Sequence, residues 1–253
     1  MLQLTNVTVS SPSKVILDDL SLTVSAGEAV GIVGESGSGK TTILKLLLGL
    51  PLNNLVFNDG SISYADQAIR PQKKRVSYPF VGTELAWVTQ QSSLGFNNNR
   101  KIKDHYKDLV KSHRSQVEKM RSLEECLQMV GLDPVQISSK YPFELSGGMM
   151  QRVAIALALA THPKLLLADE PTSALDVLSK ESFIQTLIEL LRTEESSLLF
   201  VTHDMSVAKK LADRVLVMKE GKIVEEGSRE QIFQDPQDPY TQKLLRAIPK
   251  LKL

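Results

Sequence analysis

A short glycine-rich segment constrains this chain more than any other feature. Residues 34–42 read Gly-Glu-Ser-Gly-Ser-Gly-Lys-Thr-Thr, which matches the pattern G-x-x-x-x-G-K-[ST] in full. An apolar run at residues 29–33 precedes it, and a helical pattern from about residue 40 to 48 follows it. A strand that passes through such a loop into a helix is the setting in which this pattern binds phosphate. The segment therefore predicts an α/β fold with a phosphate site at the end of a buried strand.

Physical chemistry explains why these residue types suit a phosphate-binding loop. Glycines let successive N–H groups turn toward phosphate oxygens, and the helix N-terminus adds partial positive charge. We expect Lys40 to reach the β- and γ-phosphates and the Thr41 hydroxyl to ligate Mg²⁺. A plain strand-to-helix turn is the alternative, and the match of both pattern and setting disfavours it. The predicted nucleotide-binding residues here are Gly34, Glu35, Ser36, Gly37, Ser38, Gly39, Lys40, Thr41 and Thr42.

An acidic pair follows a second apolar run. Residues 165–168 are all apolar, and Asp169 and Glu170 come directly after them. Ligands bind at the carboxyl ends of strands in open α/β sheets. We therefore expect Asp169 to hold Mg²⁺ and Glu170 to orient and deprotonate an attacking water. A surface Asp-Glu pair is the alternative, and the apolar strand before it disfavours that interpretation.

The segment Leu-Ser-Gly-Gly-Met-Met-Gln-Arg at residues 145–152 adds a third motif. Together with the first two, it resembles the L-S-G-G-Q signature of the nucleotide-binding subunits of ABC transporters. Met149 replaces the usual final Gln, as is frequent in the peptide/nickel importer branch. The resemblance implies that Ser146, Gly147 and Gly148 cap the ATP held by the phosphate loop of a second subunit, paired head to tail.

Further positions match the same family. Gln90 corresponds to the glutamine that senses Mg²⁺ and the nucleophilic water, although Gln91 is adjacent. Asp176 ends the segment Ser-Ala-Leu-Asp, which resembles the loop that crosses the dimer interface. His203 follows an apolar strand and is similar to the switch histidine. The resemblance implies that His203 bonds the γ-phosphate and holds Glu170 and the water in place.

Two segments indicate which branch of the ABC transporter family the chain resembles. The tail at residues 235–249 is similar to the P-Y-T-x-x-L-L-x-A-x-P ending of peptide and nickel importer ATPases. Residues 93–97, Ser-Leu-Gly-Phe-Asn, echo that branch's S-L-N-P segment and are expected to receive a coupling helix of a membrane subunit. The chain ends at Leu253 with no cysteine after Cys126, a short form that resembles nickel-type or metal-chelate importer subunits more than dipeptide ones.

The expected fold class is α/β, a P-loop NTPase core in which a mostly parallel sheet carries helices on both faces, because strands alternate with helices. An N-terminal antiparallel β-subdomain and an inserted helical subdomain complete it. We expect one ABC ATPase domain over residues 1–253. The catalytic core with the β-subdomain would take 1–91 and 150–227, the helical subdomain about 92–149 with the signature motif, and a C-terminal helical tail 228–253.

Charge and hydropathy limit the partners. The chain has 30 Lys and Arg against 29 Asp and Glu, a net charge of +1, whereas nucleic-acid-binding proteins usually carry a basic surplus. No apolar stretch approaches the length of about 18 residues that a membrane span needs. The resemblance implies a peripheral protein on the cytoplasmic face of the cell membrane that uses ATP and Mg²⁺. The family implies a second ABC ATPase subunit, identical or paralogous, two transmembrane permease subunits and an extracellular substrate-binding protein.

Two other functions stay open at this point, and one family feature is missing. A soluble ABC-type ATPase of a non-transport assembly, such as a phosphonate-degrading complex, is one alternative. A regulatory subunit that only binds nucleotide is the other, but Lys40, Glu170 and His203 are all present. The family usually stacks an aromatic residue on adenine, yet residues 10–13 read Ser-Ser-Pro-Ser. We expect Pro12 or Val15 to supply an apolar face instead, with weaker selectivity for the base.

Overall fold

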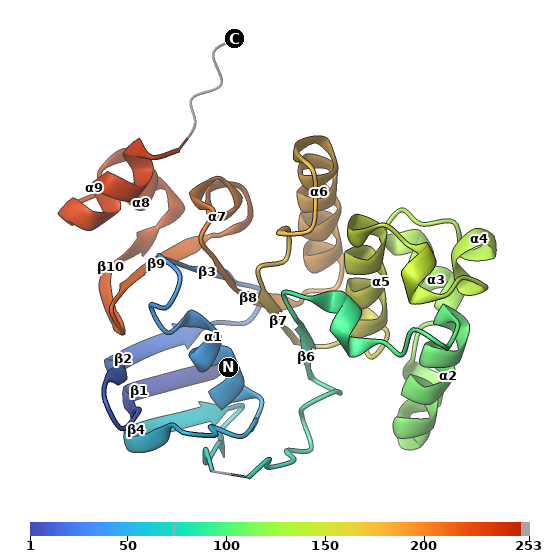
Figure 1. Cartoon of the computed structure of the whole chain (residues 1–253), viewed down its shortest axis with the longest axis horizontal. Helices are drawn as coiled ribbons and strands as arrows, with labels where there is room; N and C mark the ends of the chain where they lie inside the picture. The colour runs from blue at the N-terminus through green and yellow to red at the C-terminus, as the bar shows by residue number, and fades with distance from the viewer. Residues whose placement is uncertain (73, 249–253) are drawn as a thin grey trace. The chain divides into compact units, whose positions relative to one another are not determined.

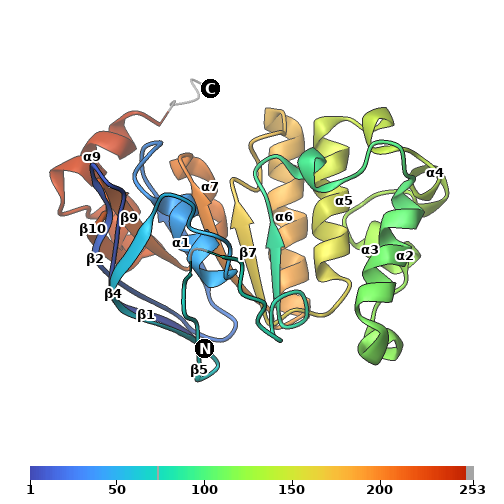
Figure 2. The ribbon, with the colours of Figure 1, turned by 60° about the horizontal axis from the view of Figure 1, so that its bottom comes forward.

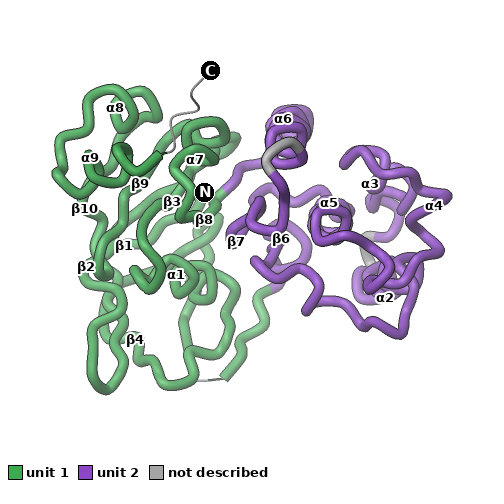
Figure 3. Tube along the Cα trace, turned by 45° about the horizontal axis from the view of Figure 1, so that its top comes forward, with its two compact units in different colours: residues 1–78, 199–253 green, residues 79–198 purple. Residues whose placement is uncertain are grey.

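The computed structural model describes residues 1–72 and 74–248, so only residues 249–253 of the predicted tail lie outside the described residues. The chain divides into two compact units (Figure 3). Unit 1 comprises Met1–Tyr78 and Leu199–Leu253, and unit 2 comprises Pro79–Leu198. The division into core, helical subdomain and tail stays a prediction.

Unit 1 contains the expected antiparallel sheet, in a region where apolar and polar residues alternate along the first 24 residues. Its strand order is β2-β1-β4-β5, with β1 (Leu2–Ser10), β2 (Val15–Val24), β4 (Val56–Tyr64) and β5 (Gln67–Ala68). Along β1, Leu2, Leu4, Val7 and Val9 are all buried, because alternate residues of a strand point to the same face, with a bulge allowing the change of phase between Leu4 and Val7. Helix α1 (Lys40–Leu47) lies beside this sheet (Figure 1).

A second group of strands in unit 1 carries the glycine-rich loop. Strand β3 (Ala29–Val33) pairs in parallel with β9 (Arg214–Lys219), which forms an antiparallel hairpin with β10 (Lys222–Ser228). Strand β8 (Ser197–Thr202), which begins in unit 2, neighbours β3 on its other side. The helices of this part are α7 (Met205–Leu211), α8 (Arg229–Gln234) and α9 (Pro239–Arg246). Apolar runs in β3, β8 and β9 fill the interior, as expected for strands that are covered on both faces.

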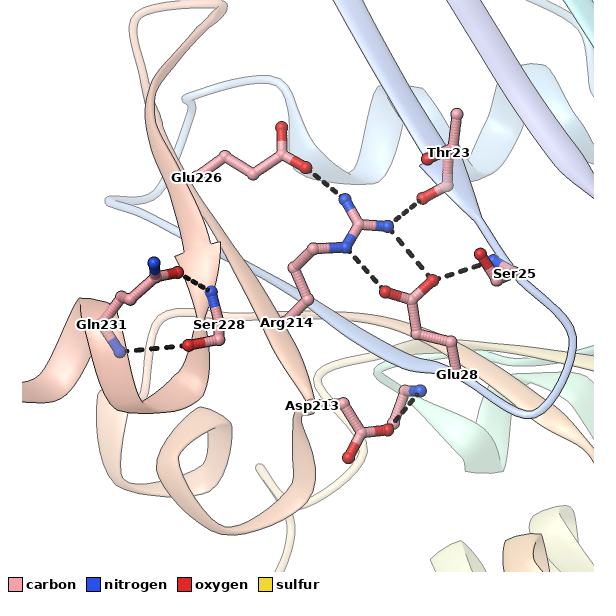
Figure 4. A network of polar contacts seen from close by, with 9 residues as sticks. Thr23, Ser25, Glu28, Asp213, Arg214, Glu226, Ser228 and Gln231 are labelled. Atoms are coloured by element: carbon pink, nitrogen blue, oxygen red, sulfur yellow. Dashed lines mark hydrogen bonds and ion pairs between the residues drawn. The ribbon is translucent and has the colours of Figure 1, made fainter.

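A charged network joins the two groups of strands in unit 1 (Figure 4). The Arg214 guanidinium donates to both carboxylate oxygens of Glu28, at 2.6 and 3.2 Å, and to the carbonyl of Thr23 at 2.6 Å. It also pairs with Glu226 of β10. Burial opposes ionisation of Glu28, but the hydrogen bonds from Arg214 and Ser25 outweigh it and lower the pKa of that carboxyl. The turn before β3 is thereby tied to β2, β9 and β10.

Unit 2 has a parallel strand pair and most of the helices (Figure 2). Strands β6 (Leu85–Val88) and β7 (Leu165–Asp169) are paired so that Val88 lies opposite Ala168. The helices are α2 (Ile102–Ser112), α3 (Leu123–Met129), α4 (Pro134–Ser138), α5 (Gly147–Leu159) and α6 (Val177–Thr193). Short 3₁₀ turns occur at Ser92–Gly95, Arg114–Lys119 and Pro142–Glu144. Within the described residues, no helix is both long enough and apolar enough to cross a membrane.

Candidate functional site

The glycine-rich loop of unit 1 runs from the end of β3 to the start of α1, as predicted. Two of its glycines are required by close approach of neighbouring backbone. A Cβ on Gly34 would lie 2.1 Å from the carbonyl oxygen of Met218, and one on Gly39 would lie 2.8 Å from that of Ile16. Gly39 also has a φ of 105°, a conformation that other residues rarely adopt. The loop is therefore shaped by β9 and β2 as well as by its own sequence.

Lys40 lies at the first position of α1, with only 7% of its surface exposed. Its ammonium donates to the carbonyls of Gly34 and Glu35, both at 2.8 Å, and to the Ser38 hydroxyl at 3.3 Å. A positive charge is thus held over the loop, next to a helix N-terminus. This combination is suited to binding a phosphate chain.

The other predicted residues of the loop differ in exposure. Glu35, Ser36, Gly37 and Thr41 are exposed, Gly39 and Thr42 are half-buried, and Gly34 and Ser38 are buried. The outer face of the loop is therefore accessible to a ligand, while its base is packed. Thr41 is in the first turn of α1, where an exposed hydroxyl can ligate a cation beside a bound phosphate.

In unit 2, the acidic pair lies at the carboxyl end of β7. Asp169 is the last residue of the strand, and both Asp169 and Glu170 are buried. Glu170 has a φ of 50°, which is uncommon for a residue with a side chain. The Ser173 N–H and hydroxyl both donate to the Glu170 carbonyl at 3.1 Å, which closes a turn around it. Backbone strain of this kind often occurs at functional sites.

Gln90 lies at the same edge of the strand pair as Asp169. The parallel register places Val88 opposite Ala168, so the segments that follow β6 and β7 leave the sheet at the same edge. Gln90 is exposed and, with Gln91, lines a hollow of about 370 Å³ together with Gly147, Gln151 and Ser173. The structure thus brings the Gln90 segment close to the signature motif and to the residues after the acidic pair.

One residue in this region was not predicted. Gln151 of α5 is 1% exposed, and its Oε1 accepts a hydrogen bond of 2.7 Å from the Ser92 hydroxyl. Ser92 also lies 3.2 Å from the Thr89 carbonyl, so α5 is tied to the segment that carries Gln90. The only sequence signal for this contact was a polar residue at a helix position whose neighbours along the same face are apolar.

The signature motif forms the N-terminus of α5. Ser146 is its N-cap, and the Ser146 hydroxyl accepts from the Met149 N–H at 3.2 Å. A Cβ on Gly148 would lie 2.7 Å from the Cδ2 methyl of Leu175, so a larger residue there would displace that side chain. Ser146, Gly147, Gly148 and Asp176 all line one hollow of about 530 Å³. The structure therefore brings the predicted signature and interface-loop residues together.

Two side chains border this hollow with defined local roles. The Asp176 carboxylate accepts the Ser179 N–H at 3.0 Å, which caps α6. Arg152 donates to the Val130 carbonyl at 2.7 Å, and its guanidinium lies 5.3 Å from the centre of the Phe183 ring. Burial lowers the pKa of Arg152, although a guanidinium keeps its charge at neutral pH. The hollow is therefore polar, with one cation in its wall.

His203 of unit 1 is exposed directly after β8. The residues on either side of it fix the turn: the Asp204 N–H donates to the Thr202 hydroxyl at 3.0 Å, and Asp204 caps α7 by accepting the Ser206 N–H at 2.8 Å. The backbone around His203 is thus held by local hydrogen bonds, and His203 directly follows the end of a strand, where ligands bind in α/β sheets.

The stretch expected near adenine contains no aromatic side chain. Residues 11–14 form the turn between β1 and β2, closed by a 2.7 Å bond from the Ser11 N–H to the Lys14 carbonyl. Pro12 is exposed, and Val15 is 45% exposed. Both side chains are available to a base, but neither can stack on it as an aromatic ring does.

The purified protein is therefore expected to discriminate weakly between ATP and GTP. The aliphatic side chains of Pro12 and Val15 have no hydrogen-bonding group that could tell adenine from guanine, so the dissociation constants of the two nucleotides should differ by less than about tenfold. Val15→Tyr should tighten the binding of both nucleotides, because an aromatic ring stacks on either base, while Val56→Tyr, an equally exposed valine at the start of β4, should not. A strong ATP preference in the unchanged protein would contradict this expectation.

A phosphate loop after a buried strand, an acidic pair after another, and a Ser-Gly-Gly helix N-terminus together define a nucleotide-binding cassette of the P-loop type. The family described as "ABC transporter" matches residues 17–173, and "Oligopeptide/dipeptide transporter, C-terminal region" matches residues 224–253. This chain belongs to the ABC transporter family, as an ATP-binding and ATP-hydrolysing subunit of the peptide/nickel importer branch.

The similarity to known relatives extends over most of the chain. It is 37% identical over 243 residues to the dipeptide transport ATP-binding protein DppD of Haemophilus influenzae, covering 95% of this chain and 73% of DppD. It is 36% identical over 241 residues to the metal-staphylopine import system ATP-binding protein CntD of Staphylococcus aureus, covering 93% and 88%. The DppD of Escherichia coli is 38% identical over 252 residues, covering 95% and 74%.

Solved structures confirm the predicted fold class. The dimeric ATP-binding cassette MJ0796 in a post-hydrolysis state, bound to ADP and Pi, matches with a TM-score of 0.72 and 27% identity, covering 90% of this chain and 99% of that one. A second dimeric structure of the same cassette gives a TM-score of 0.74. The α/β cassette fold and the ATPase class predicted from the sequence are thus both confirmed.

Proposed function

We propose that this chain powers an importer by hydrolysing ATP at sites shared between two cassettes. The observation that carries the proposal is Glu170, a buried carboxylate held at a strained backbone position after the last residue of β7. In the proposed mechanism, Lys40 and the N–H groups of the loop bind the phosphates. Glu170 takes a proton from the attacking water, and His203 orients the water and the terminal phosphate.

Magnesium is the cation we propose for this site. Thr41, Gln90 and Asp169 all offer oxygen ligands, the type that Mg²⁺ prefers, and each lies at a strand end or in the first turn of α1. When bound, the ion would neutralise charge that develops on the phosphates. The protein's part is to hold these oxygens, while ATP supplies further ligands.

A second cassette is the partner that completes each site. Ser146, Gly147 and Gly148 present the N-terminus of α5, a helix of 13 residues, at an accessible hollow beside Asp176. An anion is favoured at such a helix end. In the proposed arrangement, this surface faces the nucleotide held by the phosphate loop of the partner cassette. The dimeric state of the cassette MJ0796 supports this proposal.

A third hollow in unit 2 offers an apolar surface to a membrane subunit. It has a volume of about 290 Å³ and is lined mainly by apolar groups, including Trp87, Phe96 and Leu109. Leu94, two residues before Phe96 in the sequence, is 78% exposed and available to the same partner. We assign this surface to the coupling helix of a transmembrane permease, so that movement of the segment with Gln90 is passed to the membrane.

The finer assignment follows from the relatives. DppD is named for dipeptide transport and CntD for metal-staphylopine import, so a peptide or a metal chelate is the proposed class of cargo. The proposed assembly has two cassettes, two permease subunits and an extracellular substrate-binding protein, and this chain lies on the cytoplasmic face of the membrane. No feature of the described residues favours the alternative of a non-transport assembly.

Ser146→Arg tests the shared site. The long cationic side chain would fill the signature surface, so we expect ATP binding to the chain's own phosphate loop to stay within about threefold of wild type while ATP-dependent dimerisation is lost. Binding can be followed with a fluorescent ATP analogue, and dimerisation by light scattering with each variant combined with Glu170→Gln, so that hydrolysis does not open the dimer. Ser122→Arg is the matched control, because it removes the N-cap of α3 instead and should leave dimerisation intact. Dimerisation of the Ser146 variant at wild-type ATP concentrations would refute the assignment.

A further inference from the structure

The C-terminal helix α9 reaches the phosphate loop through one side chain. Tyr240, in the first turn of α9, accepts a hydrogen bond of 3.1 Å at its phenol oxygen from the backbone N–H of Glu35. Only 8% of Tyr240 is exposed. The two residues are 205 positions apart in the sequence. This contact belongs to the P-Y-T motif of the tail, for which the proposed function gives no role.

The bonded peptide unit is the one that also holds Lys40. Peptide groups are planar, so the N–H of Glu35 and the carbonyl of Gly34 turn as one rigid unit. Tyr240 holds the N–H end, while the Lys40 ammonium donates to the Gly34 carbonyl at 2.8 Å. When Tyr240 fixes the N–H of Glu35, it therefore also fixes the Gly34 carbonyl, the acceptor that holds the Lys40 ammonium in position.

Tyr240 is itself held in place. The Glu225 carboxylate of β10 accepts the backbone N–H groups of Gln237 and Asp238, at 2.7 and 3.1 Å. Asp238 then caps α9 by accepting the Tyr240 N–H at 2.7 Å. These bonds anchor the start of α9 to strand β10, so the position of the phenol is determined by the core of unit 1.

Contacts with the ring and with Gly34 complete the arrangement. The Lys219 ammonium at the end of β9 lies 5.2 Å from the centre of the Tyr240 ring. The neighbouring Met218 carbonyl is the group that leaves no room for a side chain on Gly34. Burial raises the pKa of the Tyr240 phenol, so its hydroxyl keeps its proton at neutral pH.

A second contact joins α9 to the loop but contributes little. The Lys243 ammonium lies 4.0 Å from the Glu35 carboxylate, and both side chains are exposed, so solvent screens their attraction.

We propose that Tyr240 is a positioning residue for ATP binding: its hydroxyl orients the Gly34–Glu35 peptide and, through it, the ammonium of Lys40. The proposal rests on the proposed function, since it concerns the same phosphate site. It gives the C-terminal P-Y-T motif an indirect part in nucleotide affinity, through the Gly34–Glu35 peptide of the phosphate loop.

Tyr240→Phe is the direct test, because it keeps the ring and its contact with Lys219 and removes only the hydroxyl. We expect the dissociation constant and KM for ATP to rise about two- to tenfold, the effect of losing one neutral hydrogen bond. The kcat at saturating ATP should stay within about twofold, since the Glu170 carboxylate is untouched. The matched control is Tyr78→Phe. The Tyr78 hydroxyl accepts the Arg70 N–H at 2.7 Å and donates to the Arg70 carbonyl at 3.0 Å, and neither group belongs to the phosphate loop. The ATP affinity of this variant should equal that of wild type.

Glu225→Ala is the second variant, because it releases the start of α9 and leaves the phenol intact. We expect it to raise the KM for ATP in the same direction as Tyr240→Phe. Wild-type ATP affinity in Tyr240→Phe, or an equal loss of affinity in Tyr78→Phe, would overturn the proposal. A wild-type protein that fails to bind or hydrolyse ATP would instead refute the proposed function, so the two failures are distinguishable.

Discussion

Replacing Glu170 by glutamine is expected to stop ATP turnover while ATP binding stays intact. Glutamine has nearly the same shape as glutamate and can still orient a water molecule, but it cannot accept a proton. Loss of a general base typically costs about 10²–10⁴-fold in rate, so phosphate release should fall by at least about a hundredfold. Because hydrolysis would open the dimer, ATP should hold the variant as a stable dimer.

Phosphate release and light scattering in the presence of ATP check this prediction for Glu170. Glu189→Gln is a suitable control, since Glu189 is an exposed carboxylate on α6 in the same unit. It should hydrolyse ATP at the wild-type rate. Turnover by the Glu170 variant at that rate would show that another group takes the proton.

Lys40→Ala is expected to remove nucleotide binding itself. The Lys40 ammonium bonds three oxygens of the loop, at 2.8, 2.8 and 3.3 Å, and is the charge closest to where phosphates would bind. Hydrogen bonds to charged groups contribute about 1.5–3 kcal/mol, so ATP affinity should fall by about ten- to 150-fold. Hydrolysis at physiological ATP should be lost as a consequence.

A fluorescent nucleotide titration measures the effect of the Lys40 substitution. Lys45→Ala provides the matched control, because Lys45 is an exposed lysine in the last turn of the same helix. Its affinity for ATP should stay within about twofold of wild type. Unchanged affinity in Lys40→Ala would mean that backbone N–H groups alone bind the phosphates.

Sequence patterns predicted most of the fold because the strands and helices obey simple periodicities. The run at residues 29–33 is a buried strand, the N-terminal alternation is an antiparallel pair, and the helix from residue 40 ends at Leu47, one residue before the expected end. Strand β6 was missed, since its four residues follow a polar stretch and carry no alternation long enough to detect. Its neighbour in the sheet, β7, is what makes it a strand.

The candidate site was predictable where one short segment carries the chemistry. The phosphate loop, the acidic pair and the signature each lie at the end of a strand or the start of a helix, as their local sequences indicate. Contacts between distant segments were not predictable. Gln151 meets Ser92 across 59 positions, and Tyr240 meets Glu35 across 205, and no periodicity encodes either pairing.

Parallel measurement of ATP binding and phosphate release on wild type, Lys40→Ala and Glu170→Gln tests the central claim most directly. All three proteins should be compared at one ATP concentration, set near the wild-type dissociation constant. We expect wild type to bind ATP and release phosphate, Glu170→Gln to bind ATP without releasing phosphate, and Lys40→Ala to do neither. Equal loss of binding in both variants, or wild-type phosphate release by Glu170→Gln, would contradict it.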